Sequence, residues 1–572
     1  MTSTASPRLA AVVRAAAPLV TDVAVRAHVV ALLAEFGVDE PTAQRWFDSG
    51  VSEADGDRVT RLRAVVDASE PTDVEQAGTG AFYTPPDLAE HIVESAIASW
   101  NGGGVPTLAD PCCGGGAVLL AAVEVLARRN GSANGVLAGI AGADIDPVAV
   151  ATTRLVLGLW SLEQTGAWSD VDVRVLDAVH GPAPADWVGH FDLIVGNPPF
   201  LGQLKVRTAR SAGEREAVGP RGYADAATLS LDRSLDWVRA GGVVALLQPR
   251  SFLGVRDADV TRQGIAEGHR LAGVWVDDRS MFDAGVRVCL PVVQRVAGHA
   301  TASPSEGIVE LSEGLPPRPL APTAAPTSGD WSSVGAAANG VPTGALAAVT
   351  STATLGDIAV VQADFRDWFY EVADVVEESE SADDDAVVRV LTSGAIEPLH
   401  TTWGRSDVTI LRRRFAAPVV SEEWLAGRTD GARRSAPKVV VANQTKVLEV
   451  FVDAAGRHVG VTPTLSVVPN DPADLSLVAA VLASPLATAH VATRTLSLGL
   501  SPTAMRVTAA SLRTVPLPSD REAWDRAAGL VADGASPTDV AAQMATAWPE
   551  VDRAATESLH TWWAGRLRPG QA

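Results

Sequence analysis

The chain has 572 residues, 47% of them hydrophobic and 20% charged, so it is long enough for two or more domains and is not a wholly disordered protein. No stretch approaches the roughly 18 uncharged apolar residues that span a bilayer, and arginines interrupt the Ala- and Val-rich N-terminus, so we expect a cytoplasmic protein. The net charge of −22 argues against indiscriminate coating of nucleic acid, although a local basic surface can still bind DNA. The three cysteines offer neither a disulfide framework nor a metal-ligand spacing.

The first 300 residues divide into two kinds of pattern. Residues 1–75 are expected to form short helices, among them 24–36, where apolar positions recur at helical spacing. From 76 to 300, short apolar runs alternate with amphipathic helices, which is typical of a mostly parallel sheet. Strands are expected at 107–109, 140–144, 171–175, 191–195, 243–247 and 273–276, and helices at 86–100, 117–129, 147–159 and 226–239. This βαβα order predicts a doubly wound, Rossmann-like α/β domain.

The second half of the chain begins with a change of composition. Residues 301–350 are rich in Pro, Gly, Ser, Thr and Ala, which indicates a linker. Residues 351–518 are expected to form a second α/β domain, followed by a helical tail at 519–572. Its expected strands are 387–391, 438–441 and 447–452, and the acidic run 377–385 is expected to be a solvated loop.

Three strand ends carry residues suited to a nucleotide-like cofactor. The segment LADPCCGGG (108–116) follows a strand and opens a helix, so its glycines let a ligand approach the backbone while the helix N-terminus offers N–H groups. Asp144 ends the next strand, where an acid accepts hydrogen bonds from ribose hydroxyls, and Asp146 is expected to cap the following helix. Asp177 ends a third strand and is a candidate acceptor for an exocyclic amine. Each feature alone also fits a plain turn or helix cap.

The most informative segment is FDLIVGNPPF (191–200), in which a strand runs into Asn-Pro-Pro and an aromatic residue. The two prolines remove N–H donors, so the turn presents acceptors, namely the Asn197 side-chain oxygen and the Pro198 carbonyl. Two acceptors suit a substrate amino group, and Phe200 offers a face on which a base can stack. The alternative is a rigid structural turn, although this combination after such a strand is unusual.

In this order the segments resemble motifs I to IV of amino-methyltransferases, arranged as in the gamma class of DNA N6-adenine methyltransferases. GAFYTP (80–85) resembles motif X of that class, which includes type IIG-like restriction-modification enzymes. The resemblance implies a catalytic domain over 76–300 that uses S-adenosylmethionine. It implies cofactor contacts from Tyr83, Thr84, Asp110, Cys113, Gly114, Gly116, Asp144, Ile145 and Asp177, and a substrate pocket of Asn197, Pro198, Pro199 and Phe200. Cys112 and Gly115 depart from the usual motif I, but both are small, so we expect cofactor binding to survive.

The C-terminal half resembles more loosely the target-recognition regions of type II methyltransferases. The segments LGDIA (355–359), PKVVVAN (437–443) and LRTVPLP (512–518) carry this resemblance. It implies that this half binds double-stranded DNA through basic side chains, namely Arg412, Arg413, Arg414, Arg433, Arg434 and Lys438. The alternative is an exposed face of a domain that does not touch DNA.

Several other functions share parts of this pattern. A protein-glutamine or small-molecule amine methyltransferase can carry Asn-Pro-Pro-aromatic, but such families typically lack the motif X element and a long C-terminal domain. An RNA base methyltransferase is another alternative. A cytosine-C5 enzyme needs a nucleophilic cysteine at the substrate end, and the N4 enzymes usually begin motif IV with Ser. A binding subunit without activity, or the modification subunit of a multi-subunit restriction or phage-defence complex, is a further alternative. With only three lysines and no nuclease pattern, the sequence predicts that any restriction nuclease is a separate partner chain.

Overall fold

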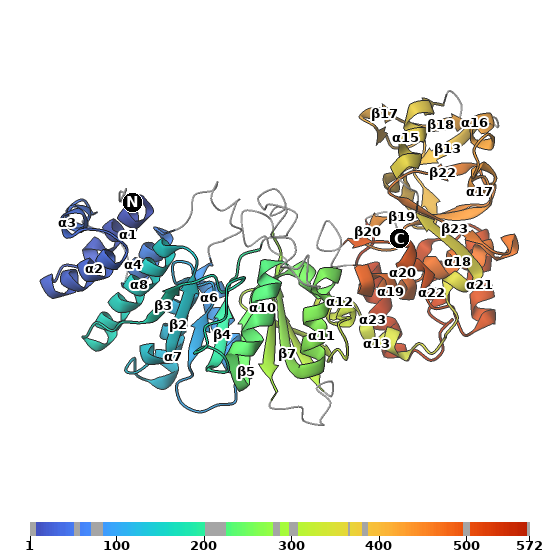
Figure 1. Ribbon diagram of the computed structural model, residues 1–572. Coiled ribbons are helices and arrows are strands. Elements are labelled where there is room, and N and C mark those ends of the chain that lie inside the picture. The colour runs from blue at the N-terminus through green and yellow to red at the C-terminus, as the bar shows by residue number, and fades with distance from the viewer. Residues whose placement is uncertain are drawn as a thin grey trace. The chain divides into compact units, whose positions relative to one another are not determined.

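The computed structural model describes residues 7–50, 58–69, 84–200, 225–277, 286–296, 307–363, 366–379, 387–495 and 504–568. The chain divides into two compact units, Met1–Trp331 and Ser332–Ala572. Figure 1 labels the elements of both units.

Unit 1 begins with four helices whose ends follow from local sequence. They are α1 (Pro7–Ala16), α2 (Val23–Glu35), α3 (Glu40–Asp48) and α4 (Arg58–Asp67). Asp22 caps α2 by accepting from the Ala24 amide, and Asp39 caps α3 by accepting from the Thr42 amide. Apolar side chains of all four helices, such as Val12, Leu33, Phe47 and Val66, join the hydrophobic core of the sheet domain.

A ten-stranded sheet forms the centre of unit 1. Its parallel part has the order β3-β2-β1-β4-β5, in which each strand continues the doubly wound pattern predicted from the sequence. These strands are β1 (Leu108–Asp110), β2 (Ile140–Asp144), β3 (Asp172–Val175), β4 (Phe191–Gly196) and β5 (Val238–Leu246). The short strand β6 (Gln248–Pro249) pairs with β8 (Val288–Arg295), which runs antiparallel between β5 and β7 (His269–Asp277). Two further strands, β9 (Ile308–Glu313) and β10 (Arg318–Ala324), extend the sheet beyond β7.

Helices cover both faces of this sheet. On one face α6 (Pro86–Ser99) packs against α7 (Ala117–Asn130), which contacts α8 (Pro147–Thr165). In front of the sheet in Figure 1 lie α10 (Ala226–Trp237) over β5 and α11 (Asp259–Gly268) over β7. Four of these helices were predicted from the sequence. The ends of α6, α7 and α10 agree with the prediction to within a few residues, whereas α8 continues six residues past its predicted end.

Unit 2 contains two four-stranded sheets and a group of helices. The first sheet is antiparallel, with the order β11 (Ala359–Ala363), β23 (Thr464–Pro469), β19 (Lys438–Ala442) and β21 (Val450–Asp453). The second has the order β12 (Glu377–Glu378), β18 (Pro418–Ser421), β13 (Val387–Leu391) and β22 (His458–Gly460). The main helices are α18 (Leu475–Leu482), α19 (Pro485–Thr495), α21 (Arg521–Ala532), α22 (Pro537–Met544) and α23 (Arg553–Ala564).

The expected linker and tail differ from what the structure contains. Within 301–350, the described residues form β9 and β10 of unit 1, then α12 (Ser332–Ala338) and α13 (Thr343–Ala348) of unit 2. Their buried side chains, such as Val309 and Ala345, explain why Pro- and Ala-rich sequence is ordered here. The helices after residue 519 share one core with β19 and β23, so they are part of unit 2.

Among the described helices, none is by itself long and apolar enough to cross a membrane, and one pair bent by 69°, Pro472–Leu482 with Pro485–Thr495, meets that test by length and composition.

Candidate active site

The candidate site lies at the carboxyl ends of four adjacent parallel strands. β1 ends at Asp110, β2 at Asp144, β3 shortly before Asp177, and β4 directly before Asn197. Since β3, β2, β1 and β4 are neighbours in the sheet, the topology brings the four predicted segments to one edge. In doubly wound sheets this edge is where ligands bind.

The glycine-rich turn after β1 is held open by backbone and side-chain contacts. Gly114 and Gly116 have positive φ angles of 52° and 95°, which favour glycine. The Thr153 hydroxyl of α8 donates to the Gly114 carbonyl at 2.8 Å. A Cβ at Gly116 would lie 3.0 Å from the same hydroxyl, whereas a Cβ at Gly114 would meet only open space. The turn is therefore closed against α8 and open at Gly114.

Asp144 is bound to this turn from the end of β2. Its Oδ2 accepts from the Gly114 amide and its Oδ1 from the Asp146 amide, both at 2.9 Å. Burial raises the pKa of Asp144 above its usual value, while these amides act in the opposite direction. Each carboxylate oxygen keeps a second lone pair, so the group can still accept from ribose hydroxyls. Asp146 caps α8 by accepting from the Val148 amide at 2.9 Å, as predicted.

Two exposed side chains follow Asp144 and β3. Ile145 is 65% exposed, which is unusual for a large apolar residue and leaves a surface that a flat base can cover. Asp177 is about half exposed, and its Oδ1 accepts from the amides of Val179 and His180 at 3.1 and 2.8 Å. Asp177 therefore caps its own turn, and its carboxylate remains accessible to a ligand.

Asp110 connects the cofactor turn with the substrate turn. Its carboxylate is buried, accepts from the Cys112 amide at 3.0 Å, and lies so close to Gly196 that a Cβ there would be 2.5 Å from Oδ1. Burial raises the pKa of Asp110 to about 8, with a further contribution from the nearby Asp144 charge. The absence of a side chain at Gly196 thus allows β1 and β4 to meet directly before Asn197.

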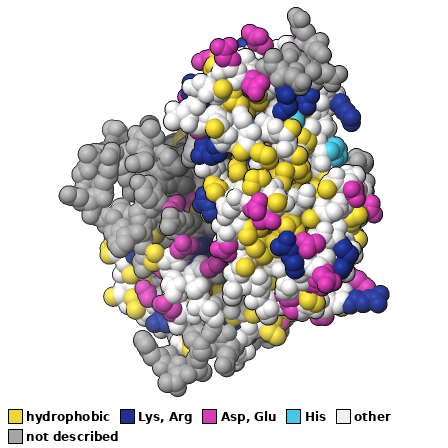
Figure 2. All heavy atoms as spheres, turned by 90° about the vertical axis from the view of Figure 1, so that its right-hand side faces the viewer, with side chains coloured by type: hydrophobic (Ala, Val, Ile, Leu, Met, Phe, Trp, Pro, Cys, Tyr) yellow, Lys and Arg dark blue, Asp and Glu magenta, His cyan; other side chains and the backbone are white. Residues whose placement is uncertain are grey.

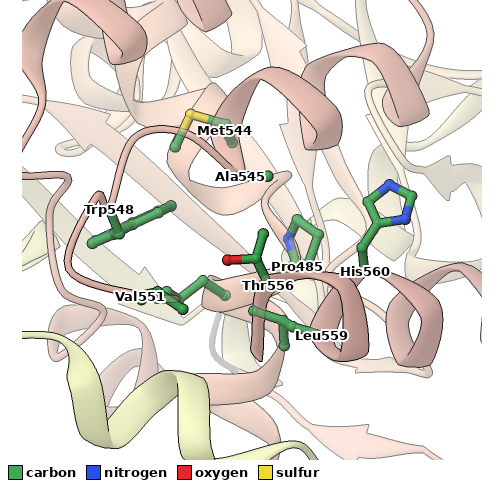
Figure 3. Close-up of a pocket in the computed structure, with 9 residues that line it drawn as sticks. Pro485, Met544, Ala545, Trp548, Val551, Thr556, Leu559 and His560 are labelled. Atoms are coloured by element: carbon green, nitrogen blue, oxygen red, sulfur yellow. The ribbon is translucent and has the colours of Figure 1, made fainter. Parts of the chain in front are cut away.

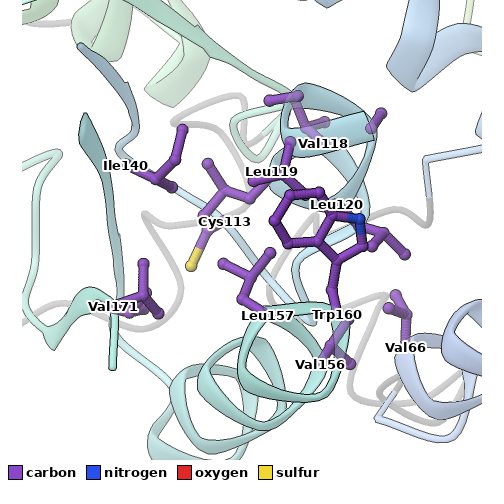
Figure 4. Packing of buried hydrophobic residues seen from close by; sticks show 14 of the residues in the cluster. Val66, Cys113, Val118, Leu119, Leu120, Ile140, Val156, Leu157, Trp160 and Val171 are labelled. Carbon is purple, nitrogen blue, oxygen red and sulfur yellow. The ribbon is translucent and has the colours of Figure 1, made fainter. Parts of the chain in front are cut away.

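Cys113 contributes to this edge through its backbone. Its side chain is 5% exposed and packs in the hydrophobic core with Leu119, Ile140 and Leu157 (Figure 4). Its amide donates to the Ala143 carbonyl at 2.9 Å, and burial raises the pKa of the thiol well above its usual value. The prediction that Cys113 lines the cofactor therefore applies to its main chain and not to its thiol.

Asn197 follows β4, where its amide Nδ2 donates to the Thr84 hydroxyl at 3.1 Å. Thr84 is buried and lies two residues before the start of α6, so the predicted motif X and motif IV meet at this hydrogen bond. Pro198 is buried and Pro199 half-buried, while Phe200 packs partly against the core of the sheet domain. Tyr83, the other predicted motif X contact, lies outside the described residues.

The N-terminal helices touch this site, which the sequence pattern did not predict. A Cβ at Gly115 would lie 2.3 Å from the Ser69 Oγ and 3.1 Å from the Val66 carbonyl, at the end of α4. Arg8 of α1 donates to the Ser69 carbonyl at 2.5 Å and forms an ion pair with Asp146 at 2.7 Å. The only sign of this contact in the sequence was Gly115, which departs from the usual motif I. The close packing of α4 explains why no side chain stands at this position.

Two of the predicted DNA-binding residues in unit 2 are committed to internal contacts. Lys438 is 2% exposed, and its Nζ donates to Asp453, Arg434 and Ala436 oxygens at 2.8, 2.7 and 3.2 Å. The prediction that Lys438 contacts DNA is therefore wrong, because burying its ammonium requires these partners. Arg434 lies 3.6 Å from the Trp368 ring centroid and pairs with Asp430, which also pairs with the more exposed Arg433.

The other three predicted arginines, Arg412, Arg413 and Arg414, are exposed on one short hairpin. On the face that Figure 2 shows, blue and magenta side chains alternate, so this face carries no single large basic patch. A separate hollow in unit 2, with an empty volume of about 310 Å³, is lined mainly by apolar side chains, including Leu486 of α19, Leu559 of α23 and Trp548 from the connection between α22 and α23 (Figure 3). The residues that line this hollow include no Asp, Glu, Lys or Arg.

Residues 69–289 match the model of the family described as N-6 DNA methylase. The type IIL restriction-modification enzyme MmeI, solved in complex with DNA, is similar over 94% of this chain and 82% of its own, at 11% identity and a TM-score of 0.53. A modification subunit of a putative type I restriction enzyme from Vibrio vulnificus YJ016 is similar over 48% of this chain, at 16% identity and a TM-score of 0.35. This chain covers 56% of that subunit.

A putative class I S-adenosylmethionine-dependent methyltransferase from Listeria monocytogenes is similar over 54% of this chain and 91% of its own, at 13% identity and a TM-score of 0.36. The comparison with curated proteins gave no match. At the identity and TM-score of MmeI the likeness concerns the fold, which agrees with the predicted Rossmann-like methyltransferase architecture. The family match covers the parallel strands β1 to β5 and all four strand ends described above. Residues 69–289 are therefore a domain of the N-6 DNA methylase family, a family of DNA methyltransferases.

Proposed function

We propose that this chain transfers the methyl group of S-adenosylmethionine to the N6 amino group of adenine in double-stranded DNA. The observation that carries the proposal is the placement of Asn197 at the end of β4, beside the glycine-rich turn that ends β1. It acts, on this view, as the modification enzyme of a restriction-modification or phage-defence system in the cytoplasm. A restriction nuclease or another subunit would then be a separate partner chain.

The residues of the strand ends fit the proposed cofactor. Asp144 offers acceptors for the ribose hydroxyls, Ile145 an apolar surface for the adenine ring, and Asp177 an acceptor for its amine. Gly114 leaves open space where any other residue would place a side chain. When bound, the cofactor supplies an electrophilic methyl group on a sulfonium centre.

Asn197 and Pro198 prepare the substrate amine. The lone pair of an adenine amino group is delocalised into the ring, so the nitrogen is a poor nucleophile. The Asn197 Oδ1 and the Pro198 carbonyl can each accept one amino hydrogen, which favours a tetrahedral nitrogen with its lone pair free to react. The hydrogen bond from Nδ2 to Thr84 holds the amide by its nitrogen, and its oxygen is the atom that can accept from a substrate amine.

Phe200 provides the stacking face for an adenine that has been rotated out of the duplex. Such extrusion costs a few kcal/mol, which stacking and phosphate contacts offset. In the transfer the new N–C bond forms as the S–C bond breaks, so S-adenosylhomocysteine would be the leaving group and the extra proton of the methylated amine would then pass to water. The Asn197, Pro198 and Phe200 groups therefore act by position and polarity.

The proposal is tested by offering the full chain labelled S-adenosylmethionine with unmethylated genomic DNA, bulk RNA and a denatured protein mixture in separate reactions. We expect label in DNA alone, and its loss in Asn197→Ala. Asn130→Ala is the matched control, because Asn130 is an exposed asparagine at the end of α7, distant from the strand ends. Label in RNA or protein, or full activity of Asn197→Ala, would contradict the proposal.

A further inference from the structure

A hairpin in unit 2 has an unusual turn. Its strands β16 (Val408–Ile410) and β17 (Arg413–Phe415) pair antiparallel, with Ile410 opposite Arg413, so Leu411 and Arg412 alone form the turn. Both residues have positive φ, 44° and 67°. Two-residue turns of this kind strongly favour Asn-Gly, since L-residues with larger side chains are strained there. Strain of this sort persists only where surrounding structure imposes it, and it concentrates at functional sites.

The base of the hairpin is rigidly held. Val408, Ile410 and Phe415 are buried in a core of unit 2, and Arg413 folds back over the Phe415 ring at 4.8 Å from its centroid. The Glu378 carboxylate accepts from the amides of Ala416 and Ala417 at 2.9 and 2.6 Å, directly after β17. These contacts fix both strands, so the apex is presented in one orientation.

The apex combines an exposed apolar side chain with exposed guanidinium groups. Leu411 is 45% exposed, although a leucine is poorly suited to water and to this backbone conformation. Arg412 and Arg414 are also exposed. Within the described parts of the chain, neither guanidinium has a hydrogen-bond or ion-pair partner.

We infer that this apex inserts into duplex DNA, with Leu411 as a wedge between adjacent base pairs and Arg412 and Arg414 on the flanking phosphates. An apolar side chain that enters a base step replaces stacking contacts, and neighbouring arginines neutralise the backbone on either side. A rigid hairpin suits this role because its backbone is already ordered before it binds, so only side chains have to be ordered. The inference rests on the proposed function, since it deepens the way in which unit 2 engages the DNA substrate.

The first measurement is the unwinding of DNA. The full chain is added to a closed-circular plasmid, topoisomerase I relaxes the DNA, and the linking number is then read on a gel. We expect the wild type and Leu411→Met to shift the distribution of topoisomers, and Leu411→Asn to lose that shift. Val360→Thr is the control, because Val360 is another exposed apolar residue of unit 2, at 48% exposure. Asn tolerates a positive φ, so Leu411→Asn should keep or raise Tm, which separates this loss from misfolding.

The second measurement is the salt dependence of affinity for a short mixed-sequence duplex. The slope of log K against log salt is negative, and each lost phosphate contact should reduce its magnitude by about 0.9, so Arg412→Ala with Arg414→Ala should reduce that magnitude by about 1.8. Leu411→Asn should leave the slope unchanged. An unchanged topoisomer shift in Leu411→Asn, or an unchanged slope in the double arginine variant, would overturn the inference. A wild-type chain that methylates no DNA would instead refute the proposed function.

Discussion

The side-chain amide of Asn197 donates to the hydroxyl of Thr84 at 3.1 Å, which joins two segments 113 residues apart in the chain. Thr84 precedes α6 and Asn197 follows β4, so the entrance of one helix fixes the amide at the end of one strand. If this amide holds the substrate amine, then Thr84 is a positioning residue for the reaction as well as a neighbour of the cofactor.

Replacing Thr84 by valine keeps its shape and removes the hydroxyl. We expect kcat to fall by about tenfold, because the Asn197 amide can then rotate away from its productive orientation. Thr84→Ser should retain most of the activity. A steady-state comparison of kcat and of KM for DNA in the three proteins checks this, and an unchanged kcat in Thr84→Val would contradict the positioning role.

Asp144 is expected to make cofactor affinity dependent on pH. Burial raises the pKa of its carboxyl, and ribose hydroxyls bind the ionised form, so affinity should fall as pH drops through that raised pKa. Asp144→Asn should bind S-adenosylmethionine more weakly and with a flatter pH dependence. Calorimetric titration from neutral pH down through the acidic range in which the protein stays folded measures both effects. An affinity of the wild type that does not change over this range would count against the role of Asp144.

The raised pKa of Asp110 predicts that the stability of the cofactor-free protein depends on pH. Burial raises its pKa from 3.8 to about 8, so the native state holds a proton that the unfolded state releases. The stabilisation is fully present below about pH 4 and is lost as pH rises toward about 8. Asp110→Asn should therefore raise Tm at pH 8 by a few degrees and have less effect at pH 5. Differential scanning calorimetry at the two pH values tests this, and a lower Tm of the variant at pH 8 would contradict it.

A substitution at Gly115 tests the contact between the N-terminal helices and the glycine-rich turn after β1. Because a Cβ there would meet the Ser69 Oγ at 2.3 Å, Gly115→Ala should lower the free energy of unfolding by about 1–3 kcal/mol and weaken cofactor binding. Ser69→Gly in the same chain should restore part of both. Gly103→Ala serves as the control, since a Cβ at Gly103 would meet nothing within 4 Å. Equal effects of Gly115→Ala with and without Ser69→Gly would show that the two residues are not coupled.

The parallel part of the sheet was predictable because each strand is short, apolar and followed by a helix. Strand β2 begins and ends at the predicted residues, and β4 extends one residue beyond its predicted end. Strand β8 was missed, although all its first six residues are buried, because its antiparallel pairing with β5 and β7 has no local signature. The expected linker failed for a related reason, since β9 and β10 gain their burial from neighbours distant in sequence.

The basic residues show that the sequence alone does not tell which of their side chains lie on the surface. Lys438 stands on a central strand, and only its pairing with Asp453 and the carbonyls near Arg434 made its burial possible. Nothing in the spacing of Lys438 distinguishes it from an exposed lysine. The contacts of Arg8 and Ser69 with the cofactor turn depend on tertiary packing in the same way.

The most direct test of the central claim is to identify the methylated base. The full chain is incubated with deuterium-labelled S-adenosylmethionine and unmethylated genomic DNA, and the digested nucleosides are analysed by mass spectrometry. The account predicts labelled N6-methyldeoxyadenosine with the wild type and none with Asn197→Ala. Label on cytosine, or no labelled nucleoside from a wild-type chain that binds both cofactor and DNA, would contradict it.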